Sequence, residues 1–308
     1  MNFECHPGPL NASVLFLDKN HRAFEVLKNP TEYSNPINIR RSDQAFWQHM
    51  KENPVGGRVE GLIHAAGFSG ILQIGYKYVD HSLITALVER WRPETHTFHL
   101  PFGETTVTLQ DVNVLWGLPI DGLPISRADT GMSMYTVRDK CQQVLGFTPE
   151  EADVRGCTIS PDNANHPIDV KFLEFLVDLP ACSGYSWGSA VLAHLYRNLC
   201  NTAAPNAIAI TGPVALLQVW VWERFRCFAP VVARFKWKGS LTCTDVSTHC
   251  LRTYRSQLQF MTEECLIGDH TTTLCVDSPI YVGVVWEFGG VVALYYTTRL
   301  WSITILNE

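Results

Sequence analysis

The chain has 308 residues, of which 46% are hydrophobic, and this can supply the core of one compact unit or of two lobes. Its 24 basic and 30 acidic residues give a net charge of −6, without any strongly basic run. This balance argues against a chain whose main ligand is nucleic acid, because phosphate neutralisation requires clustered Lys and Arg. The N-terminal residues MNFECHPGPL also lack the basic head and apolar core of a secretory signal.

The ten cysteines never lie closer than seven residues apart in the sequence. Zinc knuckles and dithiol redox motifs instead place two cysteines two to four residues apart. The spacing therefore indicates neither kind of motif. We expect reduced, mostly buried thiols of an intracellular protein.

The first part of the chain alternates polar segments with short helical patterns. Residues 29–44 are polar and contain prolines, which predicts a surface linker. A helix is expected to begin at residues 45–50. The apolar spacing within residues 59–74 predicts two short helices, jointed near Gly67 and Gly70.

A helix is predicted next, capped by Asp80 and ended by Pro93, which has no amide hydrogen to donate. Its apolar stripe consists of Leu83, Ile84, Leu87, Val88 and Trp91.

A hairpin and a second helix should follow. Residues 95–100 and 105–109 alternate as two strands around a turn. Thr108 stands three residues before Asp111, which is a capping-box spacing, and Gly117 closes the helix that begins there.

Two further helices are expected in the second half. Residues 135–145 form a helix closed by Gly146, residues 149–167 are rich in turn formers and predict a loop, and another helix starts near Ser186. Residues 214–222 contain a single polar residue, which predicts a buried central helix that is too short to span a bilayer.

The last segment is rich in β-branched and aromatic residues. Residues 280–286 and 291–296 predict two strands joined around residues 288–290. A membrane interpretation would have to bury Glu287, so we expect no membrane segment. The whole pattern predicts a mainly α fold with short β-hairpins, at the margin of α+β, as a compact helical domain.

Three stretches resemble the plant mobile domain family: LITALVERWRPETHTFHLPFGETTVTLQDVNVLWGLPIDGLP, SGYSWGSAVLAHLYRNLC and ITGPVALLQVWVWERF. With the N-terminal HPGPLNASVLFLDKNHRAFEVL, the resemblance covers most of residues 6–265. We therefore expect a plant mobile domain-like region over residues 1–265, with an internal deletion near residues 155–168. Residues 266–308 do not align with the family pattern and form a divergent C-terminal segment.

The resemblance implies a nuclear protein connected with transposon silencing, genome maintenance and meristem development, or a copy carried by a mobile element. Its implied partners are proteins, such as a phosphatase-like protein or a related family member, with weak nucleic-acid binding and no membrane. We expect a non-enzymatic interaction protein. Two alternatives are a DNA-binding module of transposase origin and an enzyme whose site is assembled from residues distant in sequence.

The candidate partner-binding residues lie at the end of the helix that Asp80 caps. A ridge with Trp91 as its anchor is flanked by charges of both signs, which suits a protein partner. The alternative is a solvated helix end with Trp91 in the core. The ridge consists of Glu89, Arg90, Trp91, Arg92 and Glu94.

Chemical sites are weakly indicated, and no catalytic residue, metal or cofactor is predicted. Glu94, His96 and His99 are possible metal ligands, but on one strand His99 points away from the other two, which favours hydrogen-bonded polar side chains. Residues 268–270 (GDH) match the start of a metallophosphatase motif, whereas GDxxDRG and GNHE are absent. No lysine has the setting of a pyridoxal site, and the Gly-Gly pairs at 56–57 and 289–290 match no nucleotide motif.

Overall fold

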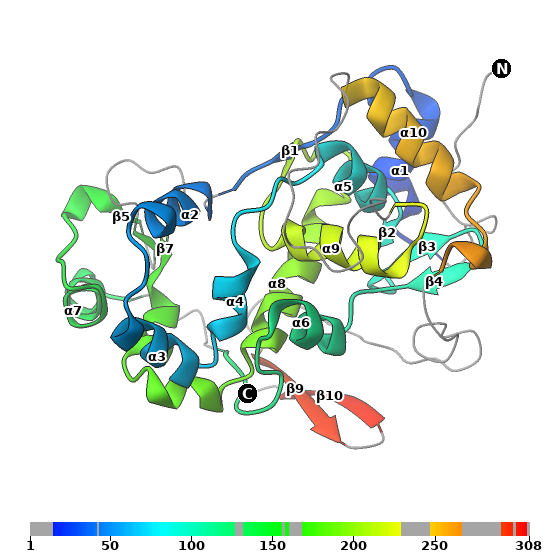
Figure 1. Ribbon diagram of the computed structural model, residues 1–308. Coiled ribbons are helices and arrows are strands. Elements are labelled where there is room, and N and C mark those ends of the chain that lie inside the picture. Colours follow the sequence, from blue (N-terminus) through cyan, green and yellow to red (C-terminus); the bar gives the residue numbers. More distant parts are fainter. Residues whose placement is uncertain are drawn as a thin grey trace. The chain divides into compact units, whose positions relative to one another are not determined.

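The computed structural model describes residues 15–41, 43–126, 132–155, 158–159, 168–228, 247–266, 291–297 and 300–306. Within these residues the chain forms ten α-helices and four small sheets, which confirms the predicted mainly α fold with short strands (Figure 1). The sequence was compatible with one compact unit or with two lobes. In the structure the chain divides into two compact units. The first comprises Met1–Gln44, Ile74–Trp116 and Val191–Val284, and the second Ala45–Gln73, Gly117–Ala190 and Val285–Glu308.

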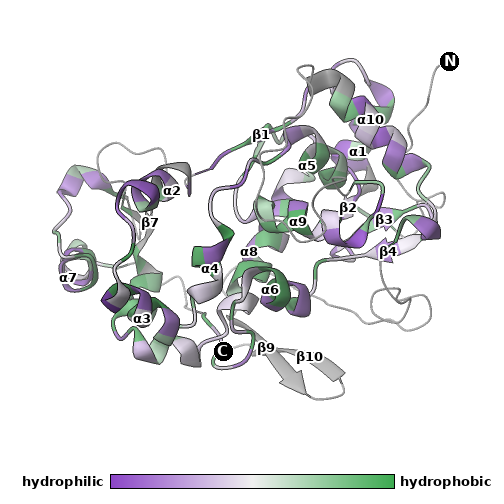
Figure 2. Ribbon diagram, viewed as in Figure 1, coloured by the Kyte–Doolittle hydropathy of each residue, from purple (hydrophilic) through white to green (hydrophobic). Residues whose placement is uncertain are grey.

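The first unit is built around two apolar helices, α5 and α9 (Figure 2). Helix α10 packs along α5, and α6 packs against α9 (Figure 1). The elements of this unit are η2 (Asp18–Asn20), α1 (Arg22–Lys28), β1 (Asn38–Ile39), α5 (His81–Val88), β2 (Trp91–Arg92), β3 (Thr97–Leu100), β4 (Gly103–Thr105), α6 (Leu109–Trp116), most of α8 (Trp187–Thr202), β8 (Ala209–Ile210), α9 (Val214–Arg224), α10 (Ser247–Gln259) and η7 (Glu263–Cys265).

Helix α9 is the predicted buried central helix, since seven of its eleven residues are buried. Trp220 is fully buried, whereas Trp222 at the end of the apolar run is half-buried. The polar exception, Gln218, is satisfied inside the core: it donates to the Tyr78 carbonyl at 2.8 Å and accepts from the Asp80 amide at 2.7 Å. A buried amide with both partners costs little, so the helix remains a core element.

Asp80 caps α5 as predicted, because its carboxylate accepts hydrogen bonds from the Ser82 and Leu83 amides at 2.9 and 3.2 Å. The helix ends at Val88, however, and not at the residue before Pro93. Beyond it, β2 pairs antiparallel with β3, with Trp91 opposite Phe98. Pairing gives the backbone of β2 hydrogen-bond partners that a helix end before proline could not provide.

The predicted hairpin is present as β3 and β4, which pair antiparallel with Leu100 opposite Gly103. Its second strand ends at Thr105, earlier than the predicted residues 105–109. The capping box is confirmed: the Thr108 amide donates to Asp111 Oδ2 at 2.8 Å, and the Asp111 amide donates to Thr108 Oγ1 at 3.2 Å. Gly117, with φ of 63°, closes α6.

The predicted linker over residues 29–44 is wrong in its middle. Strand β1 pairs in parallel with β8, which lies about 170 residues later in the chain. Ile37 is buried, and its amide donates to Thr85 Oγ1 at 3.0 Å. A strand of two residues, Asn38 and Ile39, is too short for its pairing partner to be recognised from sequence.

The second unit contains the predicted short helices at residues 45–50, 59–74 and 135–145, and Gly146 closes the last of them with φ of 74°. Its elements, with α2 and α4 each extending by a residue or two into the first unit, are α2 (Asp43–Glu52), α3 (Gly57–Ala65), α4 (Ser69–Ile74), α7 (Met134–Leu145), η3 (Glu151–Asp153), β5 (Val154–Arg155), β6 (Thr158–Ile159), β7 (Ile168–Asp169), η5 (Val170–Leu176), η6 (Pro180–Gly184), β9 (Val291–Thr297) and β10 (Leu300–Leu306).

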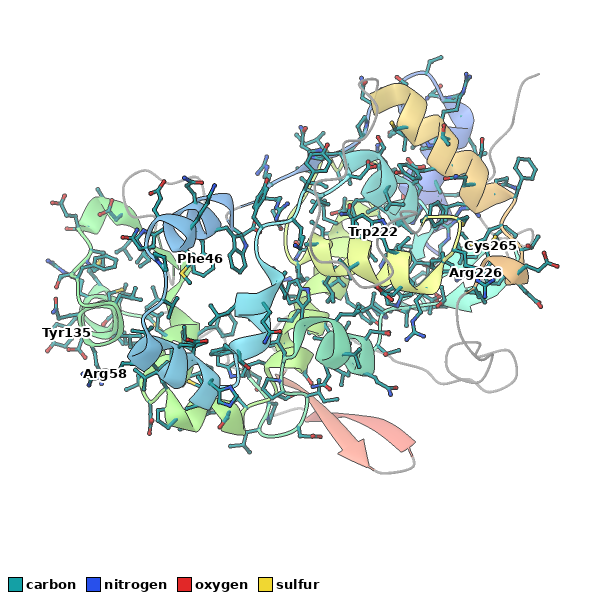
Figure 3. The ribbon with its side chains drawn as sticks, in the orientation of Figure 1. Phe46, Arg58, Tyr135, Trp222, Arg226 and Cys265 are labelled. Atoms are coloured by element: carbon teal, nitrogen blue, oxygen red, sulfur yellow. The ribbon has the colours of Figure 1, made fainter. Side chains whose placement is uncertain are left out.

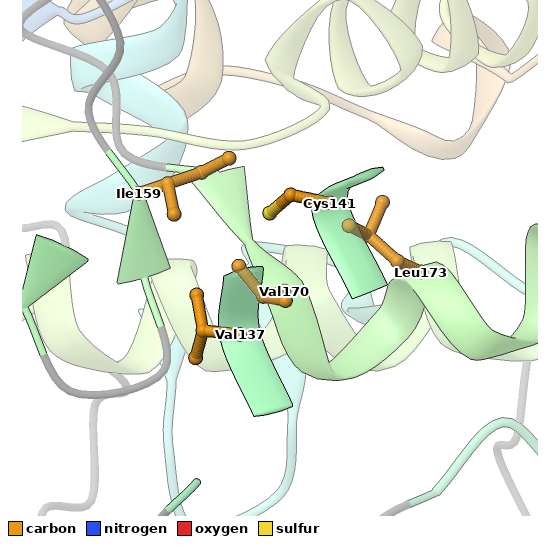
Figure 4. Close-up of a cluster of buried hydrophobic side chains, with 5 residues drawn as sticks. All are labelled: Val137, Cys141, Ile159, Val170 and Leu173. Atoms are coloured by element: carbon orange, nitrogen blue, oxygen red, sulfur yellow. The ribbon is translucent and has the colours of Figure 1, made fainter. Parts of the chain in front are cut away.

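A compact apolar cluster joins α7 to β6 and η5 (Figure 4). Ile159 contributes to it from β6, which lies between β5 and β7 in an antiparallel sheet. The prediction of a loop over residues 149–167 is therefore wrong in its described part. There β5 and β6 form strands, and Ile159 of β6 is buried in the cluster. The cluster consists of Val137, Cys141, Ile159, Val170 and Leu173.

The strand predicted at residues 291–296 is confirmed as β9. It pairs antiparallel with β10, whereas its predicted partner, residues 280–286, lies outside the described residues. In the part of the chain that the structure describes, no helix combines the length and apolarity needed to cross a membrane.

Candidate interaction site

Trp91, the expected anchor of a partner-binding ridge, is fully buried. Its indole meets Phe98 and Tyr196 edge-on, with ring centroids 4.9 and 5.0 Å apart, and Nε1 donates to Cys200 Sγ at 3.3 Å. The alternative interpretation of Trp91 as a core residue is therefore confirmed. Its rings join the hairpin to α8 within the first unit.

Glu89 is fully buried and lies in an ionic cluster. Arg255 donates to it from Nε at 2.8 Å and from Nη2 at 2.6 Å, and Arg22 Nε lies 3.6 Å from its Oε1. Burial of an isolated carboxylate costs several kcal/mol, so the two guanidinium groups are what make this position tolerable. Glu89 thus holds α1 and α10 against the end of α5.

The other charged residues of the ridge also have internal partners. Arg90 is buried and donates to Gln259 Oε1 at 2.9 Å, and Arg92 is buried as well. Glu94 is half-buried, and its Oε1 accepts from the Leu17 amide at 2.9 Å. The prediction of an exposed partner-binding ridge at residues 89–94 is wrong, and so is the solvated helix end.

The reason for this error is that the compensating groups are distant in sequence. Arg255 follows Glu89 by 166 residues, and Gln259 follows Arg90 by 169. A run of alternating charges looks solvated when only its neighbours are considered. The one available signal was the apolar stripe, which already directed Trp91 inwards.

His21 fixes the N-terminal side of this cluster, and its two ring nitrogens define one tautomer. Nδ1 accepts from the Ala23 amide at 2.9 Å, so Nε2 carries the proton and donates to the Trp91 carbonyl at 2.6 Å. Burial, with a smaller effect of the Arg92 charge, lowers the pKa of His21 to about 3. The ring is therefore neutral at physiological pH.

The three residues considered as metal ligands have separate partners. While Glu94 binds a backbone amide, His96 stacks on Tyr196 at 5.9 Å, and His99 Nε2 lies 3.3 Å from Glu104. The hydrogen bond from His99 lowers the pKa of Glu104 to about 2. Among the described residues, no group of three or more His, Cys, Asp or Glu side chains is placed to hold a metal ion.

The glycine motifs offer no phosphate cradle within the described residues. Gly56 precedes α3 and Gly57 begins it, and a Cβ on either would meet nothing within 4 Å, so no close backbone approach requires them. The GDH sequence at residues 268–270 and the glycine pair at 289–290 lie outside the described residues.

Apolar side chains that are accessible to a partner lie elsewhere, and two of them share the short helix α3 of the second unit. This helix packs against η6 but has no buried residue. Val59 and Leu62 are 51% and 39% exposed. They are three residues apart and so lie on one face of the helix, close to Arg58, which Figure 3 labels. The apolar spacing of residues 59–74 predicted the helix itself, but it did not show which of its side chains are exposed.

The structure also brings together two cysteines that sequence spacing kept apart. Cys227 and Cys265 are free thiols, and the Cys265 thiol lies close enough to Cys227 to add to the effect of burial in raising the pKa of the Cys227 side chain. Cys227 is exposed and Cys265 is half-buried, whereas Cys141, Cys182 and Cys250 are buried. The expectation of mostly buried thiols therefore fails for this pair.

Comparison with known proteins identifies relatives of this chain. The chain is 34% identical over 267 residues to "Serine/threonine-protein phosphatase 7 long form homolog" of Arabidopsis thaliana, covering 75% of this chain and 19% of the relative. It is 32% identical over 289 residues to "Protein MAIN-LIKE 1" of the same plant, covering 79% of this chain and 55% of the relative. "Protein MAINTENANCE OF MERISTEMS", also from Arabidopsis thaliana, is 32% identical over 243 residues, with 67% and 49% covered.

The chain thus spans between 19% and 55% of the length of these three relatives. No solved structure matches it. A family model of the plant mobile domain matches residues 67–156 and 154–267, which is more than half of the sequence. The chain belongs to the plant mobile domain family.

Proposed function

We propose that this chain is a non-enzymatic protein-interaction domain that acts in the nucleus, in transposon silencing, genome maintenance and meristem development. Membership of the plant mobile domain family supports the proposal, and one relative is named for the maintenance of meristems. The phosphatase name of another relative brings no catalytic residue, because the GDxxDRG and GNHE motifs are absent from this sequence.

The observation that carries the proposal is the exposed apolar face of α3. A nine-residue helix is too short to be stable alone in water, and α3 buries no residue in its own unit. Val59 and Leu62 present one side of it to solvent, at the spacing by which a helix inserts anchors into a groove of another protein. Because only about half or less of each side chain is exposed, burial of both would favour association by about 1 kcal/mol each before the costs of binding.

A protein is the occupant that fits this face. The polar neighbours Arg58 and Glu60 carry opposite charges, and the chain as a whole has a net charge of −6. A nucleic acid would require several uncancelled positive charges, whereas an apolar groove with a mixed polar rim accepts this helix. We expect the partner to be a phosphatase-like protein or another member of the family.

The proposal is tested by affinity purification of the whole chain from plant nuclei at physiological salt, with recovered proteins and nucleic acid both quantified. The variant Val59→Ser, Leu62→Ser removes the apolar face without touching the core. Glu60→Gln, on the same helix, is the matched control.

We expect a defined set of proteins with the wild type and with Glu60→Gln, and at least a tenfold lower recovery with the double variant, which corresponds to about 1.4 kcal/mol. Recovery that is equal for all three chains would refute the role of α3. Enrichment of nucleic acid, lost on nuclease treatment together with the proteins, would favour the DNA-binding alternative.

A further inference from the structure

The C-terminal end of α9 is tied by its backbone to the segment that follows α10. Phe225 and Leu266 form an antiparallel bridge. Next to it, the Arg226 amide donates to the Cys265 carbonyl at 2.7 Å, and Figure 3 shows these two residues side by side. The bridge holds the chain at residue 227 beside the chain at residue 265.

Cys227 and Cys265 lie next to this bridge. The backbone bridge and the hydrogen bond from Arg226 to Cys265 bring the two side chains into one neighbourhood, and both thiols are free. Cys227 is exposed and Cys265 half-buried, so a small reagent can reach the pair from solvent. Cys141, Cys182 and Cys250 lack this access because they are buried.

We propose that Cys227 and Cys265 form a reversible intramolecular disulfide, which makes them a redox modification site of the first unit. The oxidant is a small-molecule disulfide of the glutathione type. One protein thiolate attacks a sulfur of this disulfide, forms a mixed disulfide and releases one small thiol. The second protein thiolate then attacks the bound protein sulfur and releases the second small thiol. The two protein thiols lose two hydrogens, and one small disulfide becomes two thiols.

The order of the two attacks follows from the surroundings of Cys227. Burial of its sulfur, followed by the effect of the Cys265 thiol, raises the pKa of Cys227 to about 12 although the residue as a whole is exposed. Cys227 is therefore protonated at neutral pH, which makes it a poor nucleophile for the first attack. Cys227 thus fits the second, resolving attack, on a mixed disulfide that the backbone bridge holds beside it.

The disulfide would enclose α10, whose contacts hold α5 in place. Within that loop, Arg255 binds Glu89, and the Tyr254 hydroxyl donates to Asp80 Oδ2 at 2.7 Å. A covalent link across the open end of the loop restricts the unfolded chain, so the oxidised form should unfold at a temperature several degrees higher. Redox state would thereby set the stability of the first unit.

The test uses the whole chain, equilibrated in buffers of increasing glutathione disulfide to glutathione ratio, quenched with acid and mapped by mass spectrometry of unreduced peptides. Cys227→Ser and Cys265→Ser each remove one partner, and Cys250→Ala is the control that keeps the pair. Circular dichroism at each ratio verifies that the chains remain folded.

We expect a peptide that links residues 227 and 265, two hydrogens lighter than its parts, in the wild type and in Cys250→Ala. It should vanish on return to glutathione, and Cys227→Ser should retain a mixed disulfide on Cys265. A folded wild type that forms no 227–265 link at any ratio would overturn the proposal. Links that involve other cysteines with equal yield would overturn it as well.

Discussion

Arg255 on α10 binds Glu89 at the end of α5 through two hydrogen bonds, although 166 residues separate them in the sequence. Both side chains are shielded from water, with 12% and 1% of their areas exposed. A two-point contact between a guanidinium and a carboxylate is strong and directional, so it determines how α10 lies along α5. Residues 89–92 are buried beside this contact, although their alternating charges are typical of a protein surface.

The first prediction concerns this pair. Arg255→Met leaves the Glu89 carboxylate buried, with Arg22 at 3.6 Å as its remaining cation. We expect the free energy of unfolding to fall by about 3 kcal/mol, because the more distant Arg22 compensates only part of the buried charge. Urea denaturation followed by tryptophan fluorescence measures the loss.

The matched control is Lys28→Met, which removes the exposed ion pair of Lys28 with Glu25. Such a pair contributes less than about 1 kcal/mol, because water screens it. Similar losses in the two variants would show that the Glu89 cluster does not stabilise the unit.

The second prediction separates two tryptophans of α9. Trp220 is fully buried, and its ring lies 5.6 Å from the rings of both Phe98 and Phe225. We expect Trp220→Ala to lower the free energy of unfolding by about 3 to 5 kcal/mol through the cavity it leaves. Trp222→Ala should cost clearly less, because that side chain is half-buried. The denaturation midpoints of the two variants are the measurement. Unchanged midpoints in both variants would show that α9 is not part of the core.

The third prediction is a pH dependence set by His21. Its pKa is about 3 in the folded chain, against an ordinary value of 6.5, so the unfolded chain binds an additional proton between these values. Stability from this residue is therefore complete above pH 6.5 and is lost as the pH falls towards 3.

Melting temperatures of the wild type and of His21→Gln, measured from about pH 7 down to about pH 4.5, test this linkage. The variant should be less stable at neutral pH, and its melting temperature should fall less steeply with acidification. Parallel curves for the two chains would contradict the buried neutral imidazole.

The fourth prediction concerns cofactors. The purified chain should bind neither zinc nor pyridoxal phosphate in stoichiometric amounts, because its cysteines lack zinc-knuckle spacing and no lysine has the setting of a Schiff base. Elemental analysis and the visible spectrum of the dialysed protein provide the measurement. One equivalent of either ligand would support the enzyme alternative.

Local signals predicted the local structure well. The Asp80 cap, the capping box of Thr108 with Asp111, and the closing glycines Gly117 and Gly146 all depend on contacts within a few residues, and all are present. The apolar stripe likewise predicted that Trp91 is buried.

The rest depends on partners that the local sequence does not contain. Glu89 is buried because Arg22 and Arg255 surround it, and β1 is a strand because β8 lies beside it. Cys227 and Cys265 likewise meet only through the fold. The prediction of a partner-binding ridge was wrong for this reason, and the exposure of Val59 and Leu62 on α3 could not be predicted for the same reason.

The claim that this chain binds proteins and not nucleic acid is tested most directly by titrating labelled duplex DNA with the isolated chain at low and at physiological salt. With a net charge of −6 and charges that cancel along α3, we expect weak binding at low salt that disappears at physiological salt. Sub-micromolar binding of the duplex at physiological salt would contradict the account and would rank the DNA-binding function first.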